Sequence, residues 1–367
     1  AVFTPTDKTY AGEVKPVKIQ AKDTNGTAVT TTYTPNITPV KPTAKGTTSE
    51  GAQGQEQSGT PTFTEGNTKT PIDPTVPAKL IDPATGQPTD ATTIPAKDAK
   101  GNTVGTYTID PTTGKVTFTP NKDFTGTPVP ATVQAKDANG TPTTATSTPT
   151  IKPVTPVGVN TFTEDIQGAP QSGKPEFKPG KTTIDGKEVE VPMDDKVPAT
   201  FEDGTTTKTI PGEGTYTIED GKVKFQPEPQ FTGTATGVEV QREDTNGTTV
   251  KAKYTPTVTP VKPTGEDVTS EDVQGATQTG TPVFKGGDKE VPIDETVPAK
   301  LIDRETGKPT DKVVVEGQGT YTIDPDGVVT FTPEKDFTGQ ATGVTVQRQD
   351  KNGTTVQANY TPKVKGV

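Results

Sequence analysis

Apolar side chains alternate with polar ones along short segments of the chain, and one such pair of segments occurs three times. In the first copy, Tyr107 and Ile109 lie two residues apart, and the second segment repeats this spacing with Val116 and Phe118. Because side chains two apart point to the same face of a strand, each segment predicts a strand with one apolar face. The residues between the segments are turn formers whose number differs between copies, which indicates a β-hairpin whose loop carries no fixed chemistry. The same core positions recur as Tyr216, Ile218, Val223 and Phe225, and as Tyr321, Ile323, Val329 and Phe331.

A second hairpin is predicted after each of these, with an Asn-Gly pair at its turn. Val238 and Val240 alternate before the turn, and the alternation resumes after it as far as Tyr254. Asn-Gly between alternating strands is the strongest short hairpin signal, since both turn positions favour positive φ. The last strand runs on through Pro256, which has no N–H to donate, so we expect an edge strand. The turn residues are Asn25, Gly26, Asn139, Gly140, Asn246, Gly247, Asn352 and Gly353.

Two further positions recur with the hairpins and are interpreted as core. A Phe-Thr-Gly tripeptide follows each first hairpin, and its Phe is interpreted as a residue that fills the core where strands cross. A tyrosine follows most of the Asn-Gly turns, in the strand predicted after the turn. These additional core residues are Phe124, Phe231, Phe337, Tyr254 and Tyr360.

The repetition divides the chain into half a repeat and three complete ones. The Asp-x-Asn-Gly turn occurs four times, roughly a hundred residues apart, whereas the segment that opens a repeat occurs three times. Short Pro-rich joints at 38–43, 152–157 and 259–264 separate the copies, and proline there limits bending. We therefore expect the C-terminal half of a repeat at 1–40 and complete repeats at 41–153, 154–260 and 261–367.

The fold class follows from the kind of periodicity. No window shows convincing helical spacing, and β-branched Thr and Val dominate the predicted elements. About seven short strands per repeat, bounded by turn signals, are typical of a β-sandwich. We predict an all-β protein, an elongated tandem array of small Ig-like β-sandwich domains joined by short Pro-rich linkers.

Composition limits the core of each domain. Hydrophobic residues make up 26% of the 367 residues, and there are 38 glycines and 38 prolines. Disorder is therefore an alternative, since such chains bury little apolar surface. The apolar residues nevertheless fall at strand spacing in every copy, which a disordered spacer would not require. We expect folded domains of modest stability.

Missing residue types and net charge exclude several classes of function. There is no Cys and no His, which excludes disulfides, thiolate or histidine metal sites and a Ser-His-Asp triad. The net charge of −10 argues against nucleic acid and against anionic membranes as partners. No apolar run approaches the length of a membrane span. The prediction is a protein that is not an enzyme and has no cofactor.

The ordered motifs resemble the CshA-type fibril repeat of streptococcal surface proteins. The motif chain reads GTYTID, GKVTFTP, DFTG, VQ, D-x-NG and YTPTV, closed by the Pro-rich joint, and it covers the whole chain. The first complete repeat departs from it with Ser147 in place of the tyrosine and a Thr-rich stretch at 141–147, so its last strand should pack less well.

The resemblance implies the stalk of a fibrillar adhesin on the surface of a Gram-positive bacterium. It implies a distal adhesive region and a C-terminal cell-wall anchor, both outside this fragment. The partners would be neighbouring repeats of the same chain, that distal region and, indirectly, a host surface or other bacteria. The alternative is that the repeats themselves form a multivalent, low-affinity binding module for host matrix protein or glycan.

Four more specific interpretations concern particular residues. Glycoside hydrolysis needs a pair of carboxylates, and the sequence offers no candidate pair. The recurring acids Asp73, Asp194 and Asp294 occur once in each repeat, which is more typical of a turn cap or a solvated loop. The Asp-x-Asn-Gly motif resembles part of a calcium loop but lacks the downstream bidentate Glu, so a hairpin turn is preferred. A Lys–Asn isopeptide crosslink is not expected, because the only Asn in every repeat is the turn residue, and a Lys–Asp form stays open. Arg is scarce: Arg242, Arg304 and Arg348. Two of these share a strand position and would mark a weak ligand surface or a solvated strand face.

Overall fold

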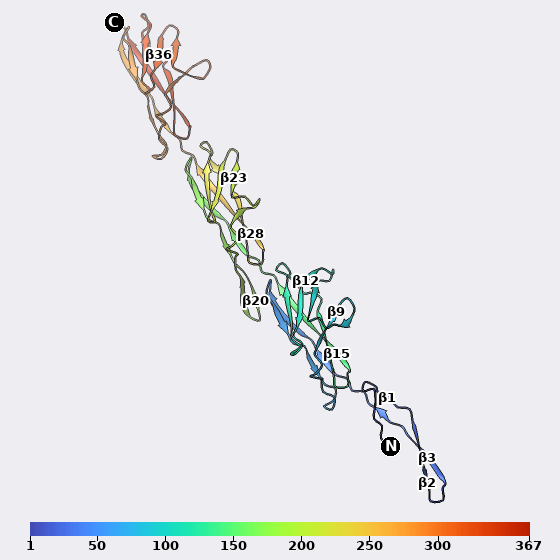
Figure 1. The fold of residues 1–367 in the computed structure, drawn as a ribbon. Coiled ribbons are helices and arrows are strands. Elements are labelled where there is room, and N and C mark those ends of the chain that lie inside the picture. The colour runs from blue at the N-terminus through green and yellow to red at the C-terminus, as the bar shows by residue number, and fades with distance from the viewer. The chain divides into compact units, whose positions relative to one another are not determined.

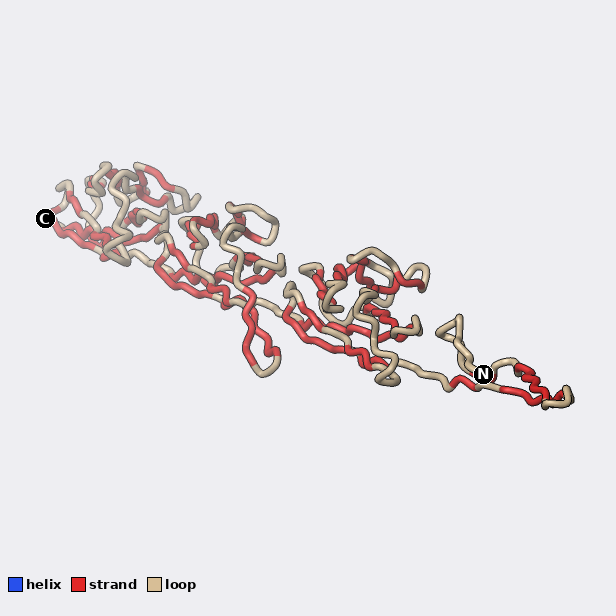
Figure 2. The backbone as a smooth tube through the Cα atoms, turned by 60° about the horizontal axis from the view of Figure 1, so that its bottom comes forward, coloured by secondary structure: helices blue, strands red, loops and turns tan.

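A computed structural model describes all 367 residues, and all its regular elements are strands. Figure 2 shows strands in red joined by tan loops, without helices, so the all-β prediction is confirmed. None of the elements is a helix with the length and apolar character that crossing a membrane requires. Contacts divide the chain into two compact units, residues 1–157, 178–194 and 243–250, and residues 158–177, 195–242 and 251–367.

The first sandwich consists of a five-stranded and a four-stranded sheet (Figure 1, labels β9, β12 and β15). The first sheet contains, in spatial order, β10 (Gln87–Pro88), β9 (Lys79–Asp82), β14 (Ala131–Lys136), β15 (Pro142–Lys152) and β6 (Thr47–Ala52). The second contains β11 (Thr93–Lys97), β12 (Thr103–Ile109), β13 (Val116–Pro120) and β7 (Gln57–Gly59). A small ribbon joins β5 (Thr43–Lys45) to β8 (Thr62–Thr64).

The second sandwich repeats this order and adds a hairpin. Its first sheet contains β17 (Thr161–Ile166), β28 (Thr249–Thr259), β27 (Val238–Glu243) and β22 (Thr200–Phe201), with β26 (Gly233–Thr234) also paired to β28. Its second contains β18 (Gln171–Gly173), β25 (Lys222–Pro227), β24 (Gly214–Glu219) and β23 (Thr207–Ile210). Two ribbons are formed by β16 (Val157–Val159) with β19 (Glu176–Lys178), and by β20 (Gly180–Ile184) with β21 (Lys187–Val191).

The third sandwich has the same two-sheet design. Its first sheet contains β30 (Val268–Val273), β40 (Thr355–Lys365), β39 (Val344–Gln349), β33 (Lys300–Ile302) and β34 (Pro309–Thr310), with β38 (Gly339–Gln340) also on β40. Its second contains β31 (Gln278–Gly280), β37 (Val329–Pro333), β36 (Gly319–Ile323) and β35 (Lys312–Val315). The small ribbon is β29 (Thr264–Glu266) with β32 (Val283–Lys285).

The first 40 residues form strands without a sandwich around them. These are β1 (Gly12–Glu13) paired with β4 (Asn36–Ile37), and β2 (Val17–Lys22) paired with β3 (Ala28–Tyr33). Every side chain of β2 is exposed, and only Tyr33 in β3 is half-buried. This segment therefore has hairpin geometry but lacks a buried apolar face.

The edge-strand prediction for the strand through Pro256 is wrong, because β28 lies inside its sheet between β17 and β27. The third sandwich shows how proline is tolerated there. On one side of β40, β39 pairs as far as Tyr360, and β38 takes over at Lys363. Pro362 lies between the part of β40 that pairs with β39 and the part that pairs with β38. No strand pairs with β40 on that side at Pro362, so the missing N–H of proline costs no ladder hydrogen bond there.

The count of about seven strands per repeat is also too low. Several strands span only two residues, such as β10 and β22, and such elements carry no detectable alternation. The parallel partner of the long last strand was not foreseen either. In the first sandwich β6 pairs in parallel with β15 from Ser147 to Lys152, and β17 and β30 occupy the equivalent place in the other two.

Each sandwich encloses one apolar cluster drawn from both sheets. In the third, Leu301 and Val346 from one sheet meet Tyr321 and Phe331 from the other, and all four are fully buried. The first and second sandwiches have equivalent clusters. Since no sheet here has both faces covered, burying one face of each sheet against the other accounts for the alternating burial along the strands.

Candidate functional site

The recurring tyrosines lie inside the sandwiches, not in an open cleft. Tyr216 stacks on Phe225 with ring centroids 4.5 Å apart, and Tyr254 meets Tyr216 edge-on at 6.3 Å. All three side chains are fully buried. In the third sandwich Tyr321 stacks on Phe331 at 4.6 Å, and burial raises the Tyr321 pKa to about 12. These rings are therefore packing residues that solvent does not reach.

The other recurring apolar residues belong to the same clusters. Fully or nearly fully buried are Tyr107, Ile109, Val116, Phe118, Ile218, Val223, Val329 and Tyr360. The partly buried ones, packed against the cluster edges, are Phe124, Phe231, Ile323 and Phe337. Phe337, for example, meets Phe331 edge-on at 6.5 Å.

In the first sandwich, Ser147 stands where the other two have a buried tyrosine. Ser147 is 5% exposed, and β15 has the same 11-residue length as the last strands of the other sandwiches. Without a tyrosine there, Tyr107 lies at 40° to Phe118, and its hydroxyl donates to the Val129 carbonyl at 2.9 Å. The equivalent hydroxyls of Tyr216 and Tyr321 are buried without a hydrogen bond. The substitution thus exchanges an aromatic contact for a hydrogen bond.

In the three sandwiches, the aspartate of the Asp-x-Asn-Gly turn is buried and organises the turn. Asp244 Oδ1 accepts hydrogen bonds from the backbone N–H groups of Asn246 and Thr248, both at 2.9 Å. Asp137 and Asp350 make the same pair of bonds, and all three aspartates are at most 1% exposed. A side chain that accepts from residues two and four positions ahead replaces backbone pairing in the turn. No group of acidic side chains in the structure is arranged to hold a metal ion.

The asparagines of these turns are not equivalent. Asn246 Nδ2 donates to the Gln53 carbonyl at 2.8 Å, and Asn352 Nδ2 donates to the Gln167 carbonyl at 2.8 Å. The side chains of Asn25 and Asn139 donate to no glutamine carbonyl, and the carboxylates of Asp23 and Asp137 accept from the backbone N–H groups of these asparagines. The glycines that follow, Gly26, Gly140, Gly247 and Gly353, all have φ between +80° and +83°.

The glutamines opposite these asparagines were missed by the sequence reasoning. Gln53 and Gln167 are 8% and 4% exposed, although they are polar residues at the end of a strand. The signal that would have found them is their recurrence as Gln-Gly in all three opening segments, with Gln274 in the third. A polar residue at one fixed position in every copy, beside a glycine, indicates a defined contact.

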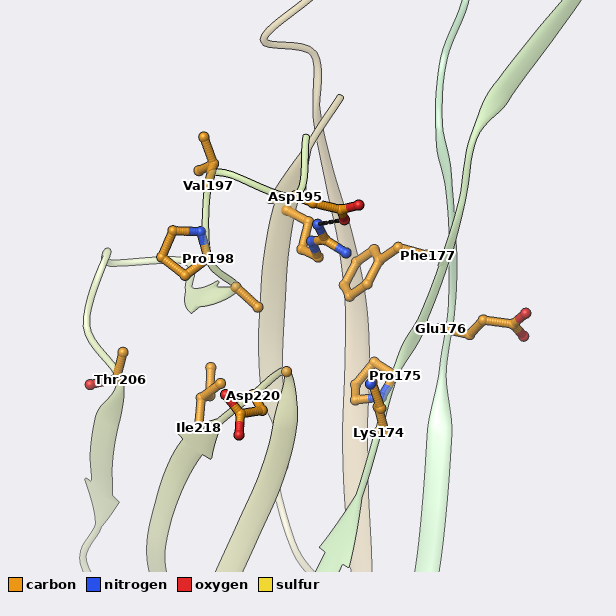
Figure 3. A pocket seen from close by; sticks show the side chains of 13 residues that line it. Lys174, Pro175, Glu176, Phe177, Asp195, Val197, Pro198, Thr206, Ile218 and Asp220 are labelled. Atoms are coloured by element: carbon orange, nitrogen blue, oxygen red, sulfur yellow. Dashed lines mark hydrogen bonds and ion pairs between the residues drawn. The ribbon is translucent and has the colours of Figure 1, made fainter. Parts of the chain in front are cut away.

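A groove beside the second sandwich has a volume of about 710 Å³ (Figure 3). Pro175, Phe177, Pro198 and Ile218 form its apolar walls, and Arg242 donates to Asp195 at 3.1 Å at its rim. Related grooves of about 480 Å³ and 260 Å³ lie at the equivalent place of the first and third sandwiches. The arginine is already paired to an acid, and the size of the groove differs between the three sandwiches. Both observations argue against one ligand shared by all the grooves.

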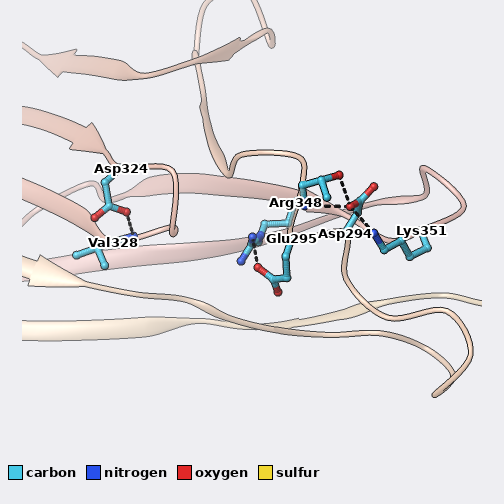
Figure 4. A network of polar contacts seen from close by, with 7 residues as sticks. Asp294, Glu295, Asp324, Val328, Arg348 and Lys351 are labelled. Atoms are coloured by element: carbon cyan, nitrogen blue, oxygen red, sulfur yellow. Dashed lines mark hydrogen bonds and ion pairs between the residues drawn. The ribbon is translucent and has the colours of Figure 1, made fainter.

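A polar network on the third sandwich contains Asp294, one of the recurring acids considered for catalysis (Figure 4). Arg348 donates to Glu295 at 2.7 Å, and Lys351 donates to Asp294 at 2.8 Å. Thr296 also donates to Asp294, through its hydroxyl and its N–H. Hydrogen bonds from Lys351 and Thr296 lower the Asp294 pKa to about 2. Asp73 caps Thr75 in the same way, which confirms the turn-cap interpretation for these two acids.

We expect acid to weaken the third sandwich over a defined pH range. Lys363 and Lys365 each contact Glu271 at 2.9 Å and lower its pKa from 4.5 to about 2. A carboxyl with a depressed folded pKa stabilises the fold fully above its unfolded pKa, so the contribution is lost as pH falls from about 4.5 to 2. An NMR titration of the Glu271 carboxyl should show this low midpoint, and Lys363→Ala together with Lys365→Ala should raise it. An unchanged midpoint in that double variant would contradict the assignment.

The repeated sandwich geometry defines the class of protein. Repeated β-sandwiches whose recurring residues fill their interiors form a tandem β-sandwich repeat protein. A family model described as the surface adhesin CshA repetitive domain matches residues 1–37, 39–151, 153–258 and 260–364. The chain belongs to this family of adhesin repeats, which places it with proteins of the cell surface.

Three solved structures are similar to the chain over most of its length, with low sequence identity. A mouse cadherin-23 fragment, EC22–24, is 12% identical, covers 89% of this chain and 100% of its own, and has a TM-score of 0.32. The I9–I11 tandem of titin is 11% identical, with coverages of 89% and 98% and a TM-score of 0.30. The human desmocollin-1 ectodomain is 12% identical, with coverages of 100% and 69% and a TM-score of 0.26. No curated protein matches the chain.

Proposed function

We propose that the chain is the structural stalk of a bacterial cell-surface fibrillar adhesin, which projects a distal adhesive region from the wall of a Gram-positive cell. We further propose that its units are a half repeat at 1–40 and complete repeats at 41–153, 154–260 and 261–367. The observation that carries the proposal is what recurs between copies. The repeated aromatic residues, such as Tyr216 and Tyr321, are fully buried, so repetition preserves the interior of each sandwich.

The proposed stalk role is supported by the scarcity of exposed aromatic residues. Hot spots of binding are typically exposed Tyr, Trp or Arg clusters. Here the exposed large apolar residues are mostly valines, and the most exposed aromatic ring among them, that of Phe162, is replaced by Thr269 at the equivalent position of the third sandwich. Family and fold together suggest a non-enzymatic protein. Net negative charge favours separation of neighbouring stalks at low salt.

A multivalent binding module is the competing function, and one observation favours it. Arg242 and Arg348 occupy the same strand position in neighbouring sandwiches, each beside an acid. The acid of each pair is exposed to solvent, which limits what the pair contributes, and the first sandwich has Ala135 at that position. The stalk is therefore the better supported function.

A binding screen separates the two functions. The full chain, immobilised at one end, is tested against host matrix proteins and a glycan panel, with an Arg242→Ala, Arg348→Ala double variant as control. The stalk predicts no saturable binding tighter than about 100 μM. Saturable binding in the low micromolar range that the double variant loses would establish the binding module instead.

A further inference from the structure

The contacts between Gln-Gly loops and Asn-Gly turns form two joints built to one design. The first joins the loop at 52–55 to the turn at 244–248, within the first compact unit, and the second joins 166–169 to 350–354, within the second. In each joint the turn asparagine donates to the glutamine carbonyl at 2.8 Å. In each, the glutamine Nε2 also lies 3.4 Å from a turn hydroxyl, that of Thr248 or Thr354. Two joints that reproduce the same bonds indicate a specific interface.

The same glutamines hold the linker. Gln53 Oε1 accepts from the Val154 N–H at 3.2 Å, and Gln167 Oε1 accepts from the Val261 N–H at 3.2 Å. Both valines are nearly fully buried. The side-chain Nε2 of each glutamine thus donates within its own sandwich and lies near the turn hydroxyl, while its Oε1 accepts from the linker.

The docking face is formed by its own sandwich before any turn occupies it. Gln274 in the third sandwich contacts no turn, yet its Nε2 donates to the Lys335 carbonyl at 2.9 Å. Gln53 and Gln167 make the equivalent bonds to Lys122 and Pro229, at 3.0 and 2.8 Å. The glutamine is therefore already oriented for docking, which reduces the entropy lost when a turn binds.

Glycine permits the close approach at both joints. A Cβ at Gly54 would lie 2.0 Å from Asn246 Oδ1, and one at Gly168 would lie 2.1 Å from Asn352 Oδ1. Gly275, at the same place in the third sandwich, has nothing within 4 Å. The three glycines have almost the same φ, +79°, +84° and +83°, so backbone strain is common to all and only the neighbour differs.

We propose that each Gln-Gly loop is a docking site whose partner is the Asp-x-Asn-Gly-Thr turn of the repeat that follows. The partner is recognised by an asparagine amide donor beside a threonine hydroxyl, presented on a turn that a buried aspartate holds rigid. The joint couples neighbouring sandwiches, so opening of the linker requires the turn to leave the loop. This inference concerns the contacts alone and does not depend on the stalk role.

The first joint has an additional element. The hairpin β20–β21, labelled β20 in Figure 1, contributes Val191 to a small apolar cluster with Ala52 and Val154. Lys152 Nζ also donates to the Thr183 carbonyl of this hairpin at 3.1 Å. At the equivalent place the third repeat has only a short turn, bridged between Asp288 and Val291. The first joint should therefore open less readily than the second.

The second joint is the better one to test, by hydrogen exchange of the full chain followed by NMR at the Val261 amide. Asn352→Asp keeps the size and turn preference of the residue but replaces the donor by an acceptor. Gly168→Ala disrupts the same contact between loop and turn, because the added Cβ would clash with Asn352. The matched controls are Asn139→Asp, at a turn without a glutamine partner, and Gly275→Ala, at a loop without a neighbour.

Both test variants should raise exchange at Val261 by about tenfold or more while leaving the amides of β24 and β25 protected, because only the joint opens. The controls should leave Val261 unchanged. Retained protection at Val261 in either test variant would overturn the proposal, as would an equal rise in the controls. If Asn352→Asp also exposes β39 and β40, its own sandwich has been disturbed and Gly168→Ala alone decides the outcome by the same criterion.

Discussion

Replacing Tyr360 by alanine is expected to destabilise the third sandwich by about 3–5 kcal/mol. The ring is fully buried, lies edge-on to Tyr321 at 6.4 Å, and its hydroxyl is hydrogen-bonded to that of Ser270 at 2.7 Å. Gly280 faces the ring, and a Cβ there would lie 2.2 Å from it, so the backbone is already as close as it can be. Truncation therefore leaves a cavity that the sheets cannot close.

Native-state hydrogen exchange of β36 and β37 measures this loss for the third sandwich separately from the rest of the chain. Ser147→Ala is the matched control, because it changes the same position in the first sandwich and removes no ring. Its cost should be below about 1 kcal/mol. A loss smaller than about 1 kcal/mol for Tyr360→Ala would show that the ring does not fill the interior.

The second large effect is expected for Asp350→Ala, at about 2–4 kcal/mol. Asp350 is 0% exposed, and its Oδ1 accepts from the N–H groups of Asn352 and Thr354, both at 2.9 Å. Removal of the carboxylate leaves two partly buried donors without partners in a turn that joins the longest strands of the sheet. Urea unfolding of the full chain, followed by exchange at β39 and β40, measures the effect.

Asp23→Ala is the matched control for this change. Asp23 makes the same two bonds, to the N–H groups of Asn25 and Thr27, but its turn is exposed. Because water replaces the lost acceptor there, the cost should stay within about 0.5 kcal/mol. Equal costs at Asp350 and Asp23 would mean that burial adds nothing to the role of the aspartate.

Local chemistry explains which parts of the fold were predictable. The β12–β13 pairing, with Tyr107 opposite Phe118 and Ile109 opposite Val116, follows from alternation and turn residues within one short segment. The parallel pairing of β6 with β15 joins residues about 100 positions apart, from Ser147↔Thr47 to Lys152↔Ala52, and β6 itself reads as a polar segment. Periodicity carries no information on such a partner, so the strand was missed.

The joint residues were hidden for a related reason. Asn246 is fully explained as a turn residue, since Asn-Gly is the expected pair there, and nothing in the hairpin pattern indicates a second role. Only the position of the turn against Gln53, almost two hundred residues earlier, reveals that its amide is also a donor to another repeat. Proline was misleading at Pro256 because a strand can change partners along its length.

The three sandwiches share their interior residues but differ at the surface. The interior positions and the buried aspartates recur, whereas the groove beside each sandwich varies between about 260 and 710 Å³. The proposed stalk role requires the interior positions and the buried aspartates, and it does not depend on the size of the groove.

Small-angle X-ray scattering of the full chain in solution tests the central claim most directly. Folded sandwiches held in sequence predict a maximum dimension on the order of 120–150 Å, far above what a compact globule of this length would show. The profile should also keep the features of folded domains. A compact particle with a maximum dimension below about 80 Å, or the scattering of an unfolded chain, would contradict the account.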